Sequence, residues 1–157
     1  MKNIYKFNFG NDINNEKLYE ETQKNIETHM LITRGIPVLL DTSLDTFFEY
    51  EEGTIYSLIE KSDIVFPEDF RIKLNDSEIN FLKQKGLLSE ESKIIPNAYT
   101  YEGISMLLTL LEDTLPDNIL IGLFRAFRRF NEFTSVHKIV EKALMSINEI
   151  KDNNTLN

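Results

Sequence analysis

The first thirty residues change from an alternating pattern of apolar and polar positions to a helical one. Alternation over residues 5–9, followed by a Gly-Asn-Asp turn, predicts a short strand. Residues 14–27 are mostly polar, and their few apolar side chains recur at helical spacing, so we expect a surface helix. Residues 1–29 are therefore predicted to form a strand-plus-helix extension.

Two short apolar runs on either side of a glycine predict a β-hairpin. The runs cover residues 30–33 and 36–40, and Gly35 between them supplies the positive φ that a tight turn needs. Pro37 has no backbone N–H, which indicates that the second strand begins at an edge of the sheet.

The pattern then predicts two short helices separated by a tight turn. Residues 41–43 offer N-cap side chains for a helix that ends near Phe48, and residues 50–53 break the apolar spacing. Thr54 can cap a second helix that ends at Lys61, and such a pair is typical of a helix-turn-helix. The exposed face of the second helix would carry Thr54, Tyr56, Ser57, Glu60 and Lys61.

Strand and helix signals alternate again in the middle of the chain. Residues 71–74 alternate as a strand, and Asn75 with Glu78 predicts a capping box for a helix that ends at Gly86. A loop over residues 87–96 and a short extended piece follow. We expect these short strands to join the hairpin in a small antiparallel sheet.

Three helices with apolar stripes are predicted for the rest of the chain. The first covers residues 104–111, and the second starts at Asp117 with a stripe that we expect in the core. Ser135 can cap the third, whose apolar side would pack within the chain or against a second copy. Residues 151–157 are predicted to form a flexible tail.

Together these elements predict an α+β fold: a small antiparallel sheet with a helix-turn-helix-like pair and a C-terminal helical bundle. The extension, the main domain, the C-terminal helix and the tail are assigned to residues 1–29, 30–133, 134–150 and 151–157.

Acidic residues outnumber basic ones by 26 to 17, which gives a formal net charge of −9. The excess is concentrated in residues 41–68, where eight acidic residues stand against Lys61 alone. An acidic chain disfavours non-specific binding to nucleic acid, because phosphates repel carboxylates. We expect these acids to form a solvated face around the helix-turn-helix.

Side chains that support catalysis or metal binding are sparse. The chain has no cysteine, and His29 and His137 each lack the neighbouring ligands that a metal site needs. It has neither a phosphate-binding glycine loop nor a nucleophile elbow. We therefore expect a binding protein rather than an enzyme, with no cofactor and no metal. Because no apolar run suits a signal peptide or a membrane span, we expect a cytoplasmic protein that does not bind membranes.

Three arginines, Arg125, Arg128 and Arg129, are neighbours on one face of a predicted helix. They either pair with Glu112 or Glu132, or contact a phosphate or an acidic partner. The spacing is compatible with both alternatives.

Three blocks of the sequence carry a resemblance to a known family. Residues 99–107 and 124–129 are similar to F-T-E-Q-G-V-x-M-L … I-M-R-A-F-V-x-L-R. Residues 66–78 are similar to F-P-E-D-F-x-F-x-L-T-x-x-E, and residues 38–61 align without gaps with a strand and helix-turn-helix. Residues 36–133 thus resemble the antirepressor-type DNA-binding domain of phages and mobile elements. This is the KilA-N/Bro-N group, in the branch named after the N-terminal domain of a phage open reading frame.

The resemblance implies an α+β domain that acts in phage gene regulation, by binding DNA or by antagonising a repressor. On duplex DNA, Thr54, Tyr56 and Ser57 would face base edges, and Lys61 would contact phosphate. A homodimer through the N- or C-terminal helices is compatible with this role. Further candidates for phosphate contacts are Arg34, Arg71, Lys73 and the three arginines of the C-terminal half.

The alternative is an acidic derivative that binds a basic protein. The family places basic residues where this chain has Gly53 and Thr54. Glu51, Glu52 and Glu60 would then engage a repressor, a host nuclease or another host defence factor, as an inhibitor or DNA mimic. A third alternative is an assembly module that dimerises through its terminal helices.

Overall fold

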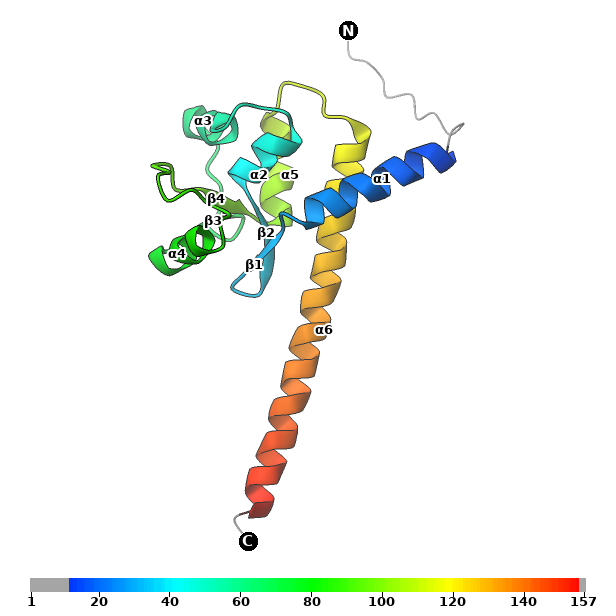
Figure 1. The fold of residues 1–157 in the computed structure, drawn as a ribbon, viewed down its shortest axis with the longest axis vertical. Helices are drawn as coiled ribbons and strands as arrows, with labels where there is room; N and C mark the ends of the chain where they lie inside the picture. Colours follow the sequence, from blue (N-terminus) through cyan, green and yellow to red (C-terminus); the bar gives the residue numbers. More distant parts are fainter. Residues whose placement is uncertain (1–11, 156–157) are drawn as a thin grey trace.

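The computed structural model describes residues 12–155, with side chains placed over residues 15–153. It shows an α+β domain and one long helix that extends away from it, as Figure 1 shows. This confirms the predicted fold class. The strand predicted at residues 5–9 lies outside the described residues.

Four antiparallel strands form the sheet in the order β1-β2-β4-β3. The predicted hairpin is confirmed, and Arg34 (φ 54°) and Gly35 (φ 76°) form its two-residue turn. Although β2 is an inner strand, its first residues pair only with β1, because β2 pairs with β4 only from Leu39 onward. Pro37 therefore lies at a local edge, as predicted, where its missing N–H costs no hydrogen bond to β4. The strands are β1 (Leu31–Thr33), β2 (Ile36–Leu40), β3 (Arg71–Lys73) and β4 (Asn97–Tyr99).

Two short helices, α2 (Asp41–Phe47) and α3 (Thr54–Lys61), form the predicted pair across a tight turn. The N-cap predictions for them are wrong. Residue 40 precedes α2 without a side-chain cap, and α3 starts after Gly53, which has a φ of 89°. The Thr54 hydroxyl donates instead to the Glu51 carbonyl over 2.6 Å.

The helix α4 (Asp76–Gln84) begins and ends as predicted. Asn75 and Glu78 form a complete capping box, and Gly86 follows the helix with a φ of 71°. The helix α5 (Tyr101–Leu110) begins after Thr100, whose hydroxyl accepts a hydrogen bond from the third residue of the helix. Local sequence signals therefore set these boundaries.

A single helix, α6 (Asp117–Thr155), replaces the two helices predicted for the C-terminal region. Ser135 lies inside α6 and donates to the carbonyl of Asn131 over 2.9 Å, so it does not cap a new helix. Residues 123–155 contain no glycine or proline that would break the helix. The helix also continues into the segment where the sequence predicts a tail.

The helix α1 (Asp12–Glu27) confirms the surface helix expected at residues 14–27, and it also joins the core. Ile26 is fully buried against the first half of α6. Gly122 of α6 allows this approach, because a Cβ there would lie 3.1 Å from both Ile26 and Thr22. The N-terminal helix thus packs on the main domain.

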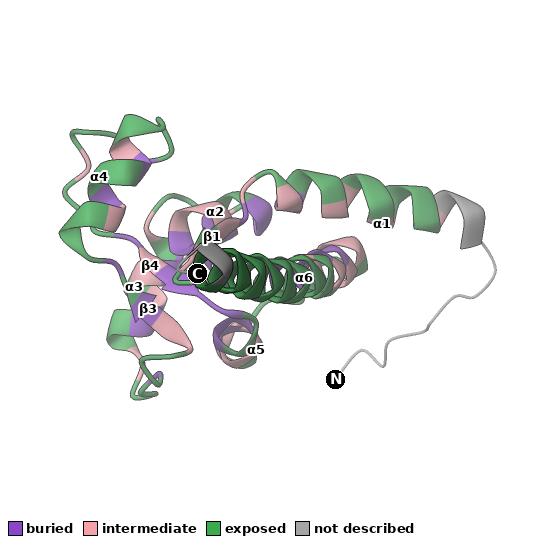
Figure 2. Cartoon of the chain, turned by 90° about the horizontal axis from the view of Figure 1, so that it is seen from below, coloured by how far each residue is buried: buried purple, intermediate pink, exposed green. Residues whose placement is uncertain are grey.

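Apolar side chains pack on both faces of the sheet. One cluster joins the sheet to α1, α2, α3, α5 and the first half of α6, and a smaller one lies under α4. Figure 2 shows how burial is concentrated around the strands, while the far half of α6 is exposed. The sheet therefore holds α3 at the surface of a packed domain.

Candidate functional site

The outer face of α3 is exposed, as the helical pattern predicts. Ile55 and Ile59 are buried on the inner face, so the polar residues of α3 point outward. Tyr56 is half-buried at the border between the two faces. The exposed residues of this face are Thr54, Ser57, Glu60 and Lys61.

A buried carboxylate holds α3 against α2. Asp45 of α2 accepts hydrogen bonds from the backbone N–H of Gly53 and of Ile55, each over 2.9 Å. These are donors that the first turn of α3 would otherwise leave unpaired. Asp45 therefore caps α3 from a neighbouring helix, and no local sequence signal identifies such a cap.

A groove of about 710 Å³ runs beside α3. On one side it is lined by Tyr56 and Glu60 of α3. On the other side β3 contributes Arg71 and Lys73, and the hairpin turn contributes Arg34. Apolar and acidic residues of the connecting loops and Asn97 of β4 complete the lining. The sheet thus brings basic side chains from distant parts of the sequence next to α3.

The basic residues of this groove differ in how they are held. Arg34 pairs with Glu78 at 2.8 Å and donates to the carbonyl of Lys73. The guanidinium of Arg71 lies 5.6 Å from the centre of the Phe66 ring, a cation–π contact. Within the described part of the chain, neither Arg71 nor Lys73 forms an ion pair. The charge of Lys73 is therefore available to a ligand, whereas Arg71 also interacts with the side chain of Tyr99.

The acidic segment is only partly the solvated face that the sequence predicts. Asp41 and Asp45 are 1% and 2% exposed. Burial raises the pKa of Asp41 to about 6, while an N–H donated by Asn97 over 3.2 Å opposes the shift. Burial also raises the pKa of Asp45, against its two amide donors. The exposed acids are Glu49, Glu51, Glu52, Glu60, Asp63 and Glu68.

Two buried polar atoms lack a hydrogen-bond partner among the described residues. They are Oδ1 of Asp41, the first residue of α2, and the hydroxyl of Tyr99, the last residue of β4. Burial, followed by the charge of Asp41, raises the pKa of Tyr99. Asp41 is therefore held in a costly environment at the start of the helix-turn-helix.

The three arginines of α6 do not form part of this groove. Arg125 pairs with Glu16 of α1, and Arg129 pairs with Glu27 at 3.1 Å. The hydrogen bond that Arg125 donates to Glu16 raises the pKa of Arg125. The predicted pairing within the chain is therefore observed, but with α1 rather than with Glu112 or Glu132. Arg128 is exposed and unpaired among the described residues.

Other candidate chemistry is limited in the described residues. His29 packs edge-on against Phe47, with ring centres 4.9 Å apart, and His137 pairs with Glu141 at 3.0 Å. Over residues 15–153 no cluster of three or more histidine or acidic side chains is arranged to hold a metal ion. No described helix combines the length and apolar character needed to cross a bilayer.

Comparisons with known proteins give one match. The family profile of the ORF6N domain matches residues 28–110, just over half of the chain. The matched stretch contains the whole sheet, α3 and the groove beside it, and it ends before α6. Neither a search of curated proteins nor a search of solved structures found a match. The chain therefore belongs to the ORF6N domain family, which indicates a phage-type regulatory protein of the antirepressor kind.

Proposed function

We propose that this protein is a phage or mobile-element transcription regulator that binds duplex DNA through α3. The observation that carries the proposal is the groove in which Arg71 and Lys73 of β3 lie beside Tyr56 of α3. Membership of the ORF6N family supports it. We also propose a binding protein rather than an enzyme, with no cofactor.

The dimensions of α3 suit the major groove of DNA. An α-helix with its side chains is about 10–12 Å across and fits a major groove about 12 Å wide, and the eight residues of α3 present about two turns to it. The hydroxyls of Thr54, Tyr56 and Ser57 would face base edges, where they can donate or accept hydrogen bonds. Specificity would then come from α3 alone.

Three basic residues would hold the phosphates on either side of α3. Lys61 is exposed at the C-terminal end of α3. Arg71 and Lys73 lie on β3, across the groove from Tyr56 and Glu60 of the helix. Neutralising three phosphates predicts that log K falls with log salt with a slope of about −2.7. Burial of Asp41 and Asp45 removes two carboxylates from the surface that would face the DNA.

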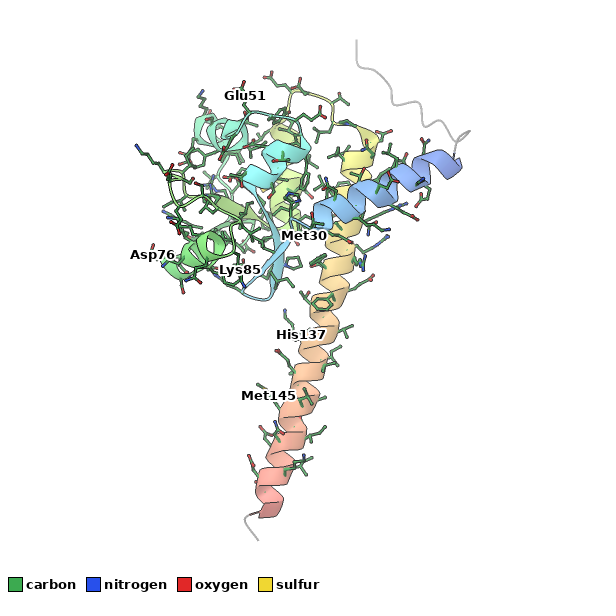
Figure 3. The ribbon with its side chains drawn as sticks, viewed as in Figure 1. Met30, Glu51, Asp76, Lys85, His137 and Met145 are labelled. Atoms are coloured by element: carbon green, nitrogen blue, oxygen red, sulfur yellow. The ribbon has the colours of Figure 1, made fainter. Side chains whose placement is uncertain are left out.

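Selection from a random duplex library at low salt tests the proposal directly. We expect an enriched sequence, and we expect Lys73→Ala to weaken its binding and to reduce the salt slope by about 1. Lys85→Ala is the matched control, because Lys85 is an exposed lysine directly after α4 and outside the groove (Figure 3). Absence of any enriched duplex, or equal losses for the two variants, would count against DNA binding.

A second candidate function is the binding of a basic protein, such as a repressor, a host nuclease or another host defence factor. Glu51 and Glu52 are exposed on the loop that leads into α3, where Figure 3 labels Glu51. Val65 is 87% exposed beside the groove and adds an apolar contact typical of protein interfaces. Glu51→Gln together with Glu52→Gln should weaken binding to the basic protein, whereas Lys73→Ala should leave that binding unaffected. The opposite ranking supports DNA.

A further inference from the structure

We infer that the far half of α6 forms a parallel, two-stranded coiled coil with a second copy of this chain. Every described residue from 135 to 153 is exposed, although many of them are apolar. In Figure 1 this part of α6 stands clear of the domain. A helix with an apolar side in water needs a partner, because packing supplies most helical stability.

The exposed apolar side chains follow a heptad repeat. They recur at alternating steps of three and four residues, which is the seam of a left-handed coiled coil. Residues 133–150 cover almost three heptads and about 27 Å of helix. The a positions are Phe133, Val140 and Ile147, and the d positions are Val136, Ala143 and Ile150.

This seam faces away from the domain. Thr134 is buried at the domain surface, and Lys138 lies beside Gly35 of the hairpin turn. These two residues occupy the b and f positions, which lie on the side of the helix opposite a and d. At the near end of the seam, Val136 borders a hollow that Tyr101 of α5 also lines. Beyond Val136 a second helix can approach the seam without meeting the domain.

The composition of the seam favours a second copy of the chain as its occupant. An a/d seam is self-complementary, since the same residues meet across a two-fold axis. In a parallel, in-register pair, Ile139 at g faces Leu144 at e of the other copy, and Glu132 faces His137. An antiparallel pair would instead set Ile139 against a polar serine. Parallel pairing thus covers the flanking apolar residues as well.

The consequence is that two domains lie at the same end of the coiled coil. The two-fold axis would run along the paired helices, so both copies of α3 would be related by it. This inference does not depend on DNA binding, because the seam lies outside the ORF6N match.

Sedimentation equilibrium of the full chain tests the association. We expect twice the monomer mass of 18.4 kDa at micromolar concentrations. Val140→Glu should raise the dissociation constant by about tenfold or more, because it buries a charge in the seam. Met145→Glu is the matched control, since Met145 is 66% exposed at an f position (Figure 3).

Both variants should keep the melting transition of the domain. At protein concentrations above its own dissociation constant, each should also keep the wild-type helical circular dichroism per residue. A monomeric wild type, or equal effects of the two variants, would overturn the association. A trimer or tetramer would overturn the two-stranded arrangement.

Orientation is tested with single cysteines, because the chain has none of its own. Ile147→Cys should cross-link on mild oxidation, since parallel pairing sets this a position against itself. Met145→Cys, on the outside of the pair, should remain a monomer on a non-reducing gel. Failure of Ile147→Cys to cross-link in a dimeric sample would rule out parallel pairing.

Discussion

Asp41 offers the sharpest quantitative test of the structure. Its carboxylate is buried at the start of α2, and one of its oxygens has no hydrogen-bond partner among the described residues. Burial raises its pKa from the ordinary 3.8 to about 6. That difference corresponds to about 3 kcal/mol, since a tenfold change in an equilibrium constant is worth about 1.4 kcal/mol.

Whether the Asp41 carboxyl stabilises or destabilises the fold at a given pH depends on whether the folded or the unfolded state binds its proton more tightly. The folded protein holds the Asp41 proton more tightly than the unfolded chain does, because its pKa is higher when folded. Stability from this group is therefore greatest below about pH 4 and is lost as the pH rises to about 6 and beyond. At neutral pH the ionised carboxylate destabilises the fold by about 3 kcal/mol.

Asp41→Asn removes the charge and keeps an oxygen that can accept the N–H of Asn97. We expect this variant to gain up to about 3 kcal/mol over the wild type between about pH 4 and pH 7.5. Urea denaturation followed by circular dichroism at both pH values measures it. Any fixed cost of fitting the amide cancels in the difference between the two pH values.

Asp63→Asn is the matched control, because Asp63 is an exposed carboxylate just beyond α3. Its free energy of unfolding should follow that of the wild type at both pH values. A free-energy difference between Asp41→Asn and the wild type that does not change with pH would refute the assignment of a raised pKa to Asp41.

Three further predictions concern single contacts, and Gly86→Ala serves as the control for the first; the free energy of unfolding of all four variants is measured by urea denaturation at neutral pH. Gly103→Ala should cost about 3 kcal/mol or more, because its Cβ would lie 2.2 Å from the carbonyl oxygen of Phe70. Gly86→Ala, with open space around it, should cost only about 1 kcal/mol from its positive φ. Asp45→Ala should cost about 2 kcal/mol, since it leaves two amides of α3 without an acceptor. Arg129→Ala should cost less than about 1 kcal/mol, because its ion pair is largely exposed; a larger loss would show that α1 depends on it.

Elements that depend on neighbouring residues could be predicted from the sequence. The Asn75–Glu78 capping box and the hairpin turn at Gly35 each lie within four residues, so their residue types are diagnostic. The outward face of α3 follows equally from the spacing of Ile55 and Ile59. These features require no knowledge of the rest of the fold.

Features set by contacts between distant residues could not be predicted. Asp41 and Asp45 look like the other acids of their segment, and only the fold shows that they are buried. The approach of α1 to Gly122 gives no signal in either segment. Ser135 is a good N-cap residue, but inside a helix its hydroxyl can instead donate to the carbonyl four residues earlier, so the local pattern did not predict the unbroken α6.

Lys73 and Glu52 lie on different surfaces around the helix-turn-helix, and this makes the two proposed partners distinguishable. Lys73 lines the groove between α3 and β3, whereas Glu52 lines a different hollow beside α2 with His29 and Tyr50. A DNA duplex centred on α3 would be drawn towards the first surface, and a basic protein towards the second. The same pair of substitutions, Lys73→Ala and Glu52→Gln, should therefore have opposite rankings for the two partners. A partner weakened equally by both would have to span α3 from one surface to the other.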